Sequence, residues 1–186
     1  MVLGYSPGET AIHSGLGKLG FDVHWLQAEM GATPLTDFDF VVSFGYRHRI
    51  PDAMIQLYQS KMLNLHISLL PWNKGANPNF WSFYDSTPSG VTIHEVSSEL
   101  DSGPILLSQE FVFDTKAMTF NDTYWQLRKG AEELLLANAL ELSKSAIPRR
   151  EQTGTGSFHS SRDLPVEFRG WGNIIHDEIL RLRKLI

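Results

Sequence analysis

The sequence predicts an α/β fold, an open, mostly parallel, twisted sheet with flanking helices, an antiparallel strand pair and a long C-terminal helix. Over the first 70 residues, short apolar runs that suit strands alternate with two segments whose apolar residues recur at helical spacing. Beyond residue 90, two apolar strands are separated only by a short turn, which favours antiparallel pairing. The predicted architecture is therefore Rossmann-like, with the antiparallel pair appended to the parallel sheet.

The first half of the chain supplies the alternating strands and helices. We predict strands at 2–5, 21–27, 38–44 and 63–69, helices at 9–19 and 52–61, a turn at 6–9 and a loop at 31–36. Gly20 ends the first helix, and Pro51 stands where helices often begin. The strand at 38–44 is rich in β-branched and aromatic residues, which favour pleated structure.

The second half is predicted to add the antiparallel pair and the long helix. We expect a loop at 71–81, a turn at 86–90, strands at 91–97 and 104–113, a helix at 120–146, a polar connector at 151–165 and a terminal amphipathic helix within 173–186. Thr119 and Asp122 form a capping-box pattern, and Pro148 stops the long helix. These features divide the chain into a catalytic domain at 1–148 and a connector with its helix at 149–186.

The terminal helix carries a single apolar stripe, formed by Ile175, Ile179, Leu182 and Ile186. Such a stripe packs either on its own chain or against a second copy in a homodimer. We favour packing on the same chain and keep the homodimer as the alternative.

Composition and charge exclude several classes of function. The formal charge of −5 comes from 21 acidic and 16 basic residues, and no basic block of the kind that nucleic acids need occurs. The absence of cysteine excludes disulfides and a cysteine nucleophile, and the seven dispersed histidines show no metal-binding spacing, so no metal is expected. Without a leader pattern or an apolar run of about 18 residues, we expect a cytoplasmic protein that does not insert into membranes.

The stretch "LNLHISLLP" alternates apolar and polar residues, so that Asn64, His66 and Ser68 share one face of a strand. Asn64 and His66 come near the carboxyl end of this strand, where ligands gather in open α/β sheets. Ser68 lies next to the proline loop and is expected to support the turn. A serine triad is not indicated, because Ser68 is outside any Gly-x-Ser-x-Gly pattern.

Asp101 follows in "LDSGPILLSQ", on a glycine-terminated turn between two apolar strands. Taken alone, such an aspartate often makes only its own turn. Together, however, Asn64, His66 and Asp101 would provide a donor for a developing oxyanion, a proton carrier and a carboxylate that tunes this carrier. These groups indicate acyl or one-carbon transfer.

The segments "NLHISLLPWNKGANPNFW", "SGVTIH" and "LDSGPILLSQE" resemble the folate-dependent formyltransferase family. This family includes the glycinamide ribonucleotide, methionyl-tRNA and sugar N-formyltransferases. Its pattern has an Asn-x-His strand, a Ser-Leu-Leu-Pro loop, Gly-Val-Thr and an Asp-x-Gly turn in this order. The match is clear from Phe38 to Gln109.

The resemblance implies a role for each residue of the motif. Asn64 would donate its amide to the formyl oxygen as the carbonyl becomes tetrahedral. His66 would move protons between the attacking amine, the intermediate and the folate nitrogen that leaves. Asp101 would hold the charged form of His66 or order a water that relays the proton.

The resemblance also implies 10-formyltetrahydrofolate as the formyl donor, bound between "GYRHRIP" and "EVSSELD". The candidate folate-binding residues are Tyr46, Arg47, His48 and Ile50 in the first loop and Ser98 and Glu99 in the second. The alternative for the basic cluster is a solvated loop. His94, in "GVTIH", is either a second candidate behind His66 or a hydrogen-bonded core histidine.

The acceptor is expected to be a primary amine on a small molecule. Lys74 stands where the family often has arginine, and its cation could meet a phosphate or carboxylate; the alternative is an exposed loop lysine. The phrase "GANPNFWSFYDSTPSGVTIH" is most similar to the sugar N-formyltransferases, so a nucleotide-linked amino sugar is favoured. A glycinamide ribonucleotide acceptor, hydrolysis of 10-formyltetrahydrofolate and a catalytically idle folate-binding module remain alternatives.

Overall fold

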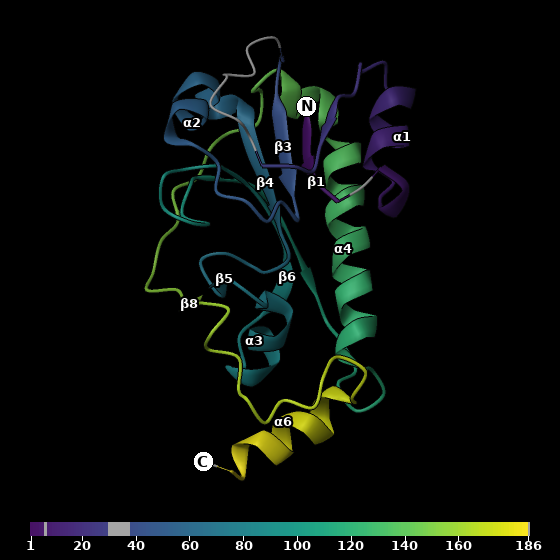
Figure 1. Ribbon diagram of the computed structural model, residues 1–186, viewed down its shortest axis with the longest axis vertical. Helices are drawn as coiled ribbons and strands as arrows, with labels where there is room; N and C mark the ends of the chain where they lie inside the picture. Colours follow the sequence, from purple (N-terminus) through teal and green to yellow (C-terminus); the bar gives the residue numbers. More distant parts are fainter. Residues whose placement is uncertain (6, 30–37, 186) are drawn as a thin grey trace.

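The computed structural model describes residues 1–5, 7–29 and 38–185. These form three layers, a central sheet with helices on both of its faces (Figure 1). Helix α2 (Asp52–Tyr58) covers one face of the sheet, and α1 (Ile12–Lys18) and α4 (Phe120–Ala137) cover the other (Figure 1). The loop predicted at 31–36 lies outside the described residues. No described helix has the length and apolarity needed to cross a membrane.

The sheet has six strands in the order β2-β1-β3-β4-β6-β7. The strands are β1 (Val2–Gly4), β2 (Trp25–Leu26), β3 (Val41–Phe44), β4 (Met62–His66), β6 (Ser89–Glu95) and β7 (Ile105–Phe111). The first four run parallel to one another, whereas β6 is antiparallel to both β4 and β7. The predicted Rossmann-like class, with its antiparallel pair, is confirmed.

Five of the six predicted strands are longer than the observed ones, and β2 and β4 show why. Strand β2 has only two residues, because it pairs only with Val2 and Leu3 of β1. Phe21 and Val23, before it, still pack on the core. Strand β4 ends at His66, since Ser68 turns away to donate its hydroxyl to the carbonyl of Trp72 at 2.7 Å. The turn-supporting role expected for Ser68 is confirmed.

Beyond small shifts of helix ends, the helices differ from the predictions at two places. Helix α3 (Pro78–Tyr84) occupies part of the predicted loop, and it begins where Asn77 adopts a left-handed φ of 54° and Pro78 takes the first helical turn. The predicted helix at 120–146 is divided into α4 and α5 (Ala139–Ser143) at Asn138, whose amide donates to the carbonyl of Leu134 at 2.8 Å.

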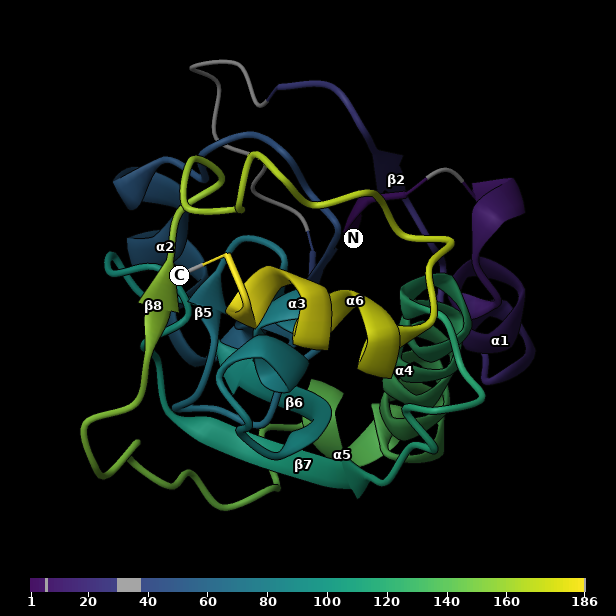
Figure 2. The ribbon, with the colours of Figure 1, turned by 90° about the horizontal axis from the view of Figure 1, so that it is seen from below.

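Helix α6 (Ile175–Arg183) packs within the chain (Figure 2). Its buried residues Ile175, Ile179 and Leu182 form one apolar cluster with three aromatic residues. These are Phe80 and Trp81 of α3 and Phe120, the first residue of α4. The favoured packing on the same chain is therefore confirmed for the three α6 residues, and Ile186 lies outside the described residues.

The segment before α6 pairs with the loop that follows β4. Strand β8 (Phe158–His159) is parallel to β5 (Lys74–Gly75), in a small second sheet that the sequence analysis did not predict. Arg150 forms an isolated antiparallel bridge with Ile105 at the start of β7. The segment at 149–159 therefore runs beside both the β4 loop and the β6–β7 connection.

The predicted capping box at the start of α4 is present. The Thr119 hydroxyl accepts from the Asp122 N–H at 3.2 Å, and the Asp122 carboxylate accepts from the Thr119 N–H at 2.8 Å. Thr119→Ala should lower the free energy of unfolding by about 1 kcal/mol, as for loss of other helix caps. Urea denaturation measures this value. Thr155→Ala, at an exposed position, is the control, and equal effects of the two variants would contradict the prediction.

Candidate active site

Asn64 and His66 of β4 lie on the same face of the sheet as α2. This helix covers the face only near the start of β4. Met62, on the same face, is buried in the cluster that contains Met54 and Tyr58 of α2. Beyond this cover, the face is open to a cavity that Asn64 and His66 line. The opposite face of β4 buries Leu63 and Leu65 in the main core. The predicted division of this strand into a core face and a polar face is confirmed.

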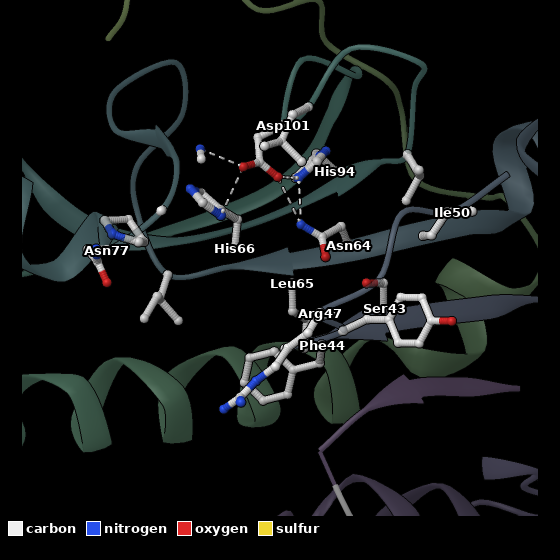
Figure 3. A pocket seen from close by; sticks show the side chains of 18 of the residues that line it. Ser43, Phe44, Arg47, Ile50, Asn64, Leu65, His66, Asn77, His94 and Asp101 are labelled. Atoms are coloured by element: carbon white, nitrogen blue, oxygen red, sulfur yellow. Dashed lines mark hydrogen bonds and ion pairs between the residues drawn. The ribbon is translucent and has the colours of Figure 1, made fainter. Parts of the chain in front are cut away.

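The turn between β6 and β7 brings Asp101 onto these two residues (Figure 3). Asn64 Nδ2 donates to Asp101 Oδ1 at 3.2 Å, and Asp101 Oδ2 lies 3.6 Å from His66 Nδ1. Asp101 and His66 are each only 7% exposed. The structure therefore brings together the three catalytic candidates that the sequence singled out.

His94 is the fourth member of this cluster. It is the cross-strand neighbour of Asn64, whose Nδ2 lies 3.1 Å from His94 Nε2, and Asp101 Oδ1 lies 3.5 Å from the same nitrogen. His94 Nδ1 donates to the carbonyl of Glu95 at 2.8 Å, so Nε2 is the nitrogen that accepts from Asn64 in the neutral ring. His94 is thus a buried, hydrogen-bonded histidine that also supports the site.

His66 has a different hydrogen-bond arrangement. Its Nε2 donates to the carbonyl of Asn73 at 2.9 Å, which fixes a proton on that nitrogen. Nδ1 faces the carboxylate of Asp101 and is the position where the ring gains or loses its second proton. This geometry suits a proton carrier beside a carboxylate.

The Asp101 carboxyl is held in its ionised form. Burial by itself would raise its pKa, but the neighbouring His66 and His94 and the N–H of Gly75, which donates to Oδ2 at 2.8 Å, outweigh burial and hold the pKa below the usual range. Gly75 reaches this position with a φ of 86°, and a Cβ there would lie 2.3 Å from the carbonyl oxygen of His159. The backbone at this position requires glycine.

The cavity has a volume of about 1050 Å³, at the upper end of the range for small-molecule sites. Its lining includes the catalytic candidates and five of the six predicted folate-binding residues, Tyr46, Arg47, His48, Ile50 and Ser98. Glu99 and Lys74 are not among the described residues that line it. The Lys74 ammonium donates to the Ser102 hydroxyl at 3.1 Å, next to Asp101.

A second polar group on the cavity wall was missed by the sequence analysis. The hydroxyls of Tyr5 and Tyr124 lie 2.7 Å apart, and the guanidinium of Arg128 stacks 3.8 Å from the centre of the Tyr5 ring. Burial, together with the Tyr124 hydroxyl, raises the pKa of Tyr5, so its phenol stays protonated. No local motif joins Tyr5 to Tyr124 and Arg128, which follow it by more than 100 positions in the sequence.

Within the described part of the chain, no group of three or more His, Cys, Asp and Glu side chains is arranged to hold a metal ion. His66 and His94 each lie within ion-pair distance of the Asp101 carboxylate, at 3.6 and 3.5 Å. The arrangement is suited to moving protons and orienting an amide.

The chain belongs to the formyl transferase family, whose sequence model matches residues 31–139. The match includes β3, β4, β6, β7 and α4, and therefore Asn64, His66, His94 and Asp101. The resemblance that the sequence motifs indicated is confirmed.

Among curated relatives, the dTDP-4-amino-4,6-dideoxyglucose formyltransferase of Mycobacterium bovis is 28% identical over 137 residues. The alignment covers 74% of this chain and 57% of the relative, so the chain spans little more than half the length of that enzyme. The corresponding protein of Mycobacterium tuberculosis matches equally well.

Among solved structures, the formyltransferase PseJ from Anoxybacillus kamchatkensis has a TM-score of 0.86 and 31% identity, with 94% of each chain covered. It was crystallised with UDP-4,6-dideoxy-4-formamido-L-AltNAc and tetrahydrofolate. The N-formyltransferase from Helicobacter canadensis, with a TM-score of 0.75, covers 99% of this chain and 81% of its own. At 16% identity it shows the shared fold alone.

Proposed function

We propose that this protein transfers a formyl group from 10-formyltetrahydrofolate to a primary amine on a nucleotide-linked amino sugar. The observation that carries the proposal is the contact of Asn64, His66 and Asp101 on the wall of one large cavity. PseJ, similar over almost the whole chain, was crystallised with tetrahydrofolate and a formamido sugar nucleotide, which supports both substrates.

The folate is assigned to the part of the cavity between the loop after β3 and the turn before β7. Tyr46, Arg47, His48, Ile50 and Ser98 line this part. The exposed Arg47 offers a cation to the carboxylates of the folate glutamate. Glu99 remains a predicted folate contact; its carbonyl accepts from the Ser97 hydroxyl at 2.8 Å and from the Ser102 N–H at 3.3 Å within the same turn.

In the proposed reaction, the neutral amine of the acceptor attacks the formyl carbon, and a new C–N bond forms. The bond from this carbon to the folate nitrogen then breaks, and the proton lost by the amine is delivered to that nitrogen. His66 carries the proton at Nδ1, while Asp101 stays ionised and stabilises the imidazolium. Because no residue becomes formylated, positioning of the two substrates is a large part of the catalysis.

Asn64 is the proposed donor to the oxygen of the tetrahedral intermediate. In the structure its Nδ2 is directed to Asp101 Oδ1 and lies 3.1 Å from His94 Nε2. Donation to the intermediate therefore requires Asn64 to exchange one of these partners for the substrate oxygen. Lys74 remains a predicted contact for an acceptor phosphate, and its present bond to Ser102 places it beside the Asp101 turn.

Incubation with 10-formyltetrahydrofolate and separate amine acceptors should test the proposal. The acceptors are dTDP- and UDP-linked 4-amino and 3-amino sugars, glycinamide ribonucleotide and water alone, and mass spectrometry measures the products. We expect one formyl group to be added to a nucleotide-linked amino sugar, with stoichiometric tetrahydrofolate. Formate release in every reaction would indicate a hydrolase, and folate binding without any turnover would indicate an idle module; either result would contradict the proposal.

Three sequence predictions accompany this proposal. These are the boundary between a catalytic domain at 1–148 and an additional segment at 149–186, the cytoplasmic location, and the homodimer that was kept as an alternative. Sedimentation at several protein concentrations would measure the oligomeric state. A monomer at all concentrations would rule out the homodimer and leave the proposed reaction unaffected.

A further inference from the structure

Gln152 reaches the turn that carries Asp101 from a distant part of the chain. Its Nε2 donates to the carbonyl of Asp101 at 2.8 Å and to the carbonyl of Gly103 at 2.8 Å. One side-chain amide therefore holds the backbone on both sides of Ser102. Gln152 belongs to the segment after Pro148, which the sequence analysis treated as an addition to the catalytic domain.

The turn has a conformation that needs external support. Asp101 has a φ of 51°, in the left-handed region that residues with a Cβ rarely adopt. Gly103 lies so close to β6 that a Cβ there would be 2.0 Å from the carbonyl oxygen of Glu95. Two carbonyls of this turn are directed at Gln152, so the same hydrogen bonds satisfy the backbone and fix its shape.

The segment that carries Gln152 is itself anchored to the sheet. Arg150 exchanges two backbone hydrogen bonds with Ile105, at 2.7 and 2.9 Å, and Arg149 forms an ion pair with Glu95 at the end of β6. Gln152 therefore projects from a backbone that is tied to both strands flanking the turn. A side chain mounted in this way can define the position of the Asp101 carboxylate.

Only the NH₂ group of the Gln152 amide forms hydrogen bonds within the described residues. Its Oε1 is buried and has no hydrogen-bond partner among the described residues. Leaving an acceptor unpaired costs about 1–3 kcal/mol, which a purely space-filling apolar residue would avoid. The two donated hydrogen bonds are thus the contribution that glutamine makes at this position.

The same segment also contacts Asn73, the residue that accepts a hydrogen bond from His66. The Ser157 hydroxyl accepts from the Asn73 N–H at 2.8 Å and donates to Asn73 Oδ1 at 3.0 Å. The Asn73 carbonyl in turn accepts from His66 Nε2. Within the segment at 149–159, Gln152 therefore contacts the turn that carries Asp101. Ser157 contacts Asn73, whose carbonyl accepts from His66.

We propose that Gln152 is a positioning residue, which holds the Asp101 turn so that the carboxylate stays against His66. The effect of Gln152 on turnover rests on the proposed formyl transfer. Its effect on the position of the Asp101 carboxylate is independent of the reaction. Gln152 acts through the turn and not through contact with the substrates, and it is not among the described residues that line the cavity.

Three variants test this role. Gln152→Met keeps the length of the side chain and removes both donors, whereas Gln152→Lys restores a donor of similar reach. Gln126→Met makes the first substitution at an exposed position of α4 and is the control. Gln152→Met should lower kcat by about 10²-fold, because small misplacements of catalytic groups have effects of this size. KM for both substrates should stay within about twofold of the parent value, and Gln152→Lys should recover most of kcat.

A second readout does not depend on turnover. Carbon-detected NMR follows the Asp101 carboxyl during an acid titration, with His66 and His94 facing it and the Lys74 ammonium beside its turn. In the parent and Gln152→Lys, Asp101 should remain ionised as the pH falls through the usual aspartate range, around 3.9. In Gln152→Met the pKa should rise, because the contacts to His66, His94 and the Gly75 N–H loosen.

The outcomes separate the two proposals. An unchanged Asp101 titration in Gln152→Met would overturn the positioning role, even if the variant were less stable. A Gln152→Lys variant that behaves like Gln152→Met in both readouts would overturn the donor explanation. If the parent formylates none of the acceptors, the proposed function fails, while the titration still decides the role of Gln152.

Discussion

Replacement of Asp101 by asparagine should reduce formyl transfer by about two to four orders of magnitude, while the folate still binds. The neutral amide cannot stabilise an imidazolium at His66. It also introduces a donor beside existing donors, because Oδ1 accepts from Asn64 and Oδ2 accepts from the Gly75 N–H. In either orientation, the new NH₂ group faces an existing donor. Single-turnover kinetics and equilibrium binding of tetrahydrofolate measure the two quantities.

The same variant should alter the pH dependence of stability. The native pKa of Asp101 is held below its ordinary value of about 3.9. A lowered native pKa stabilises the folded state fully above the unfolded pKa, and this contribution is lost as the pH falls through the native pKa. Urea denaturation of the parent should therefore show a loss of stability below about pH 4 that is smaller in Asp101→Asn.

Asp114→Asn is a matched control for both measurements. Asp114 is another turn aspartate whose carboxylate accepts from a backbone N–H, that of Lys116 at 3.0 Å, and it is not among the described residues that line the cavity. We expect parent-like transfer from this control. Parent-like transfer from Asp101→Asn as well would reduce Asp101 to a turn residue, the alternative that the sequence left open.

The sequence predicted those parts of the fold that depend on local periodicity. Alternation located β4 and its two faces, and the spacing of Thr119 and Asp122 located the start of α4. Features set by partners distant in the sequence were missed. Strand β8 forms only because β5 lies beside it. The break at Asn138 was also missed, although its side-chain hydrogen bond to the carbonyl of Leu134 is local. These interactions leave no periodic pattern in the sequence.

The candidate site shows the same division. Asn64, His66 and Asp101 lie in ordered motifs, so the sequence could name all three. The partners that fix their geometry could not be identified, because Gln152 is 51 positions from Asp101 and joins it through backbone carbonyls, which carry no sequence signal. Asn73 presents its carbonyl to His66, and any residue could do so. The side chains that meet at the site were thus predictable, whereas the backbone groups that hold them were not.

Asn64→Ala should lower kcat by about 10²–10³-fold, as for loss of an oxyanion donor in other acyl-transfer enzymes. Folate binding should change little, because the proposed folate contacts lie in the loops after β3 and β6. Asn138→Ala, which also removes an asparagine that donates to a carbonyl, is the control outside the cavity lining. Rapid-quench measurement of formyl transfer gives kcat for each variant.

The structure adds an alternative that the single variant cannot resolve. Since Asn64 Nδ2 donates to Asp101 Oδ1, its removal could act only through the carboxylate. A double-mutant cycle of Asn64→Ala and Asp101→Asn separates the two effects. If Asn64 also stabilises the formyl oxygen, the double variant should be slower than Asp101→Asn alone by at least about tenfold. Equal rates would restrict Asn64 to the support of Asp101 and leave the oxyanion to another donor.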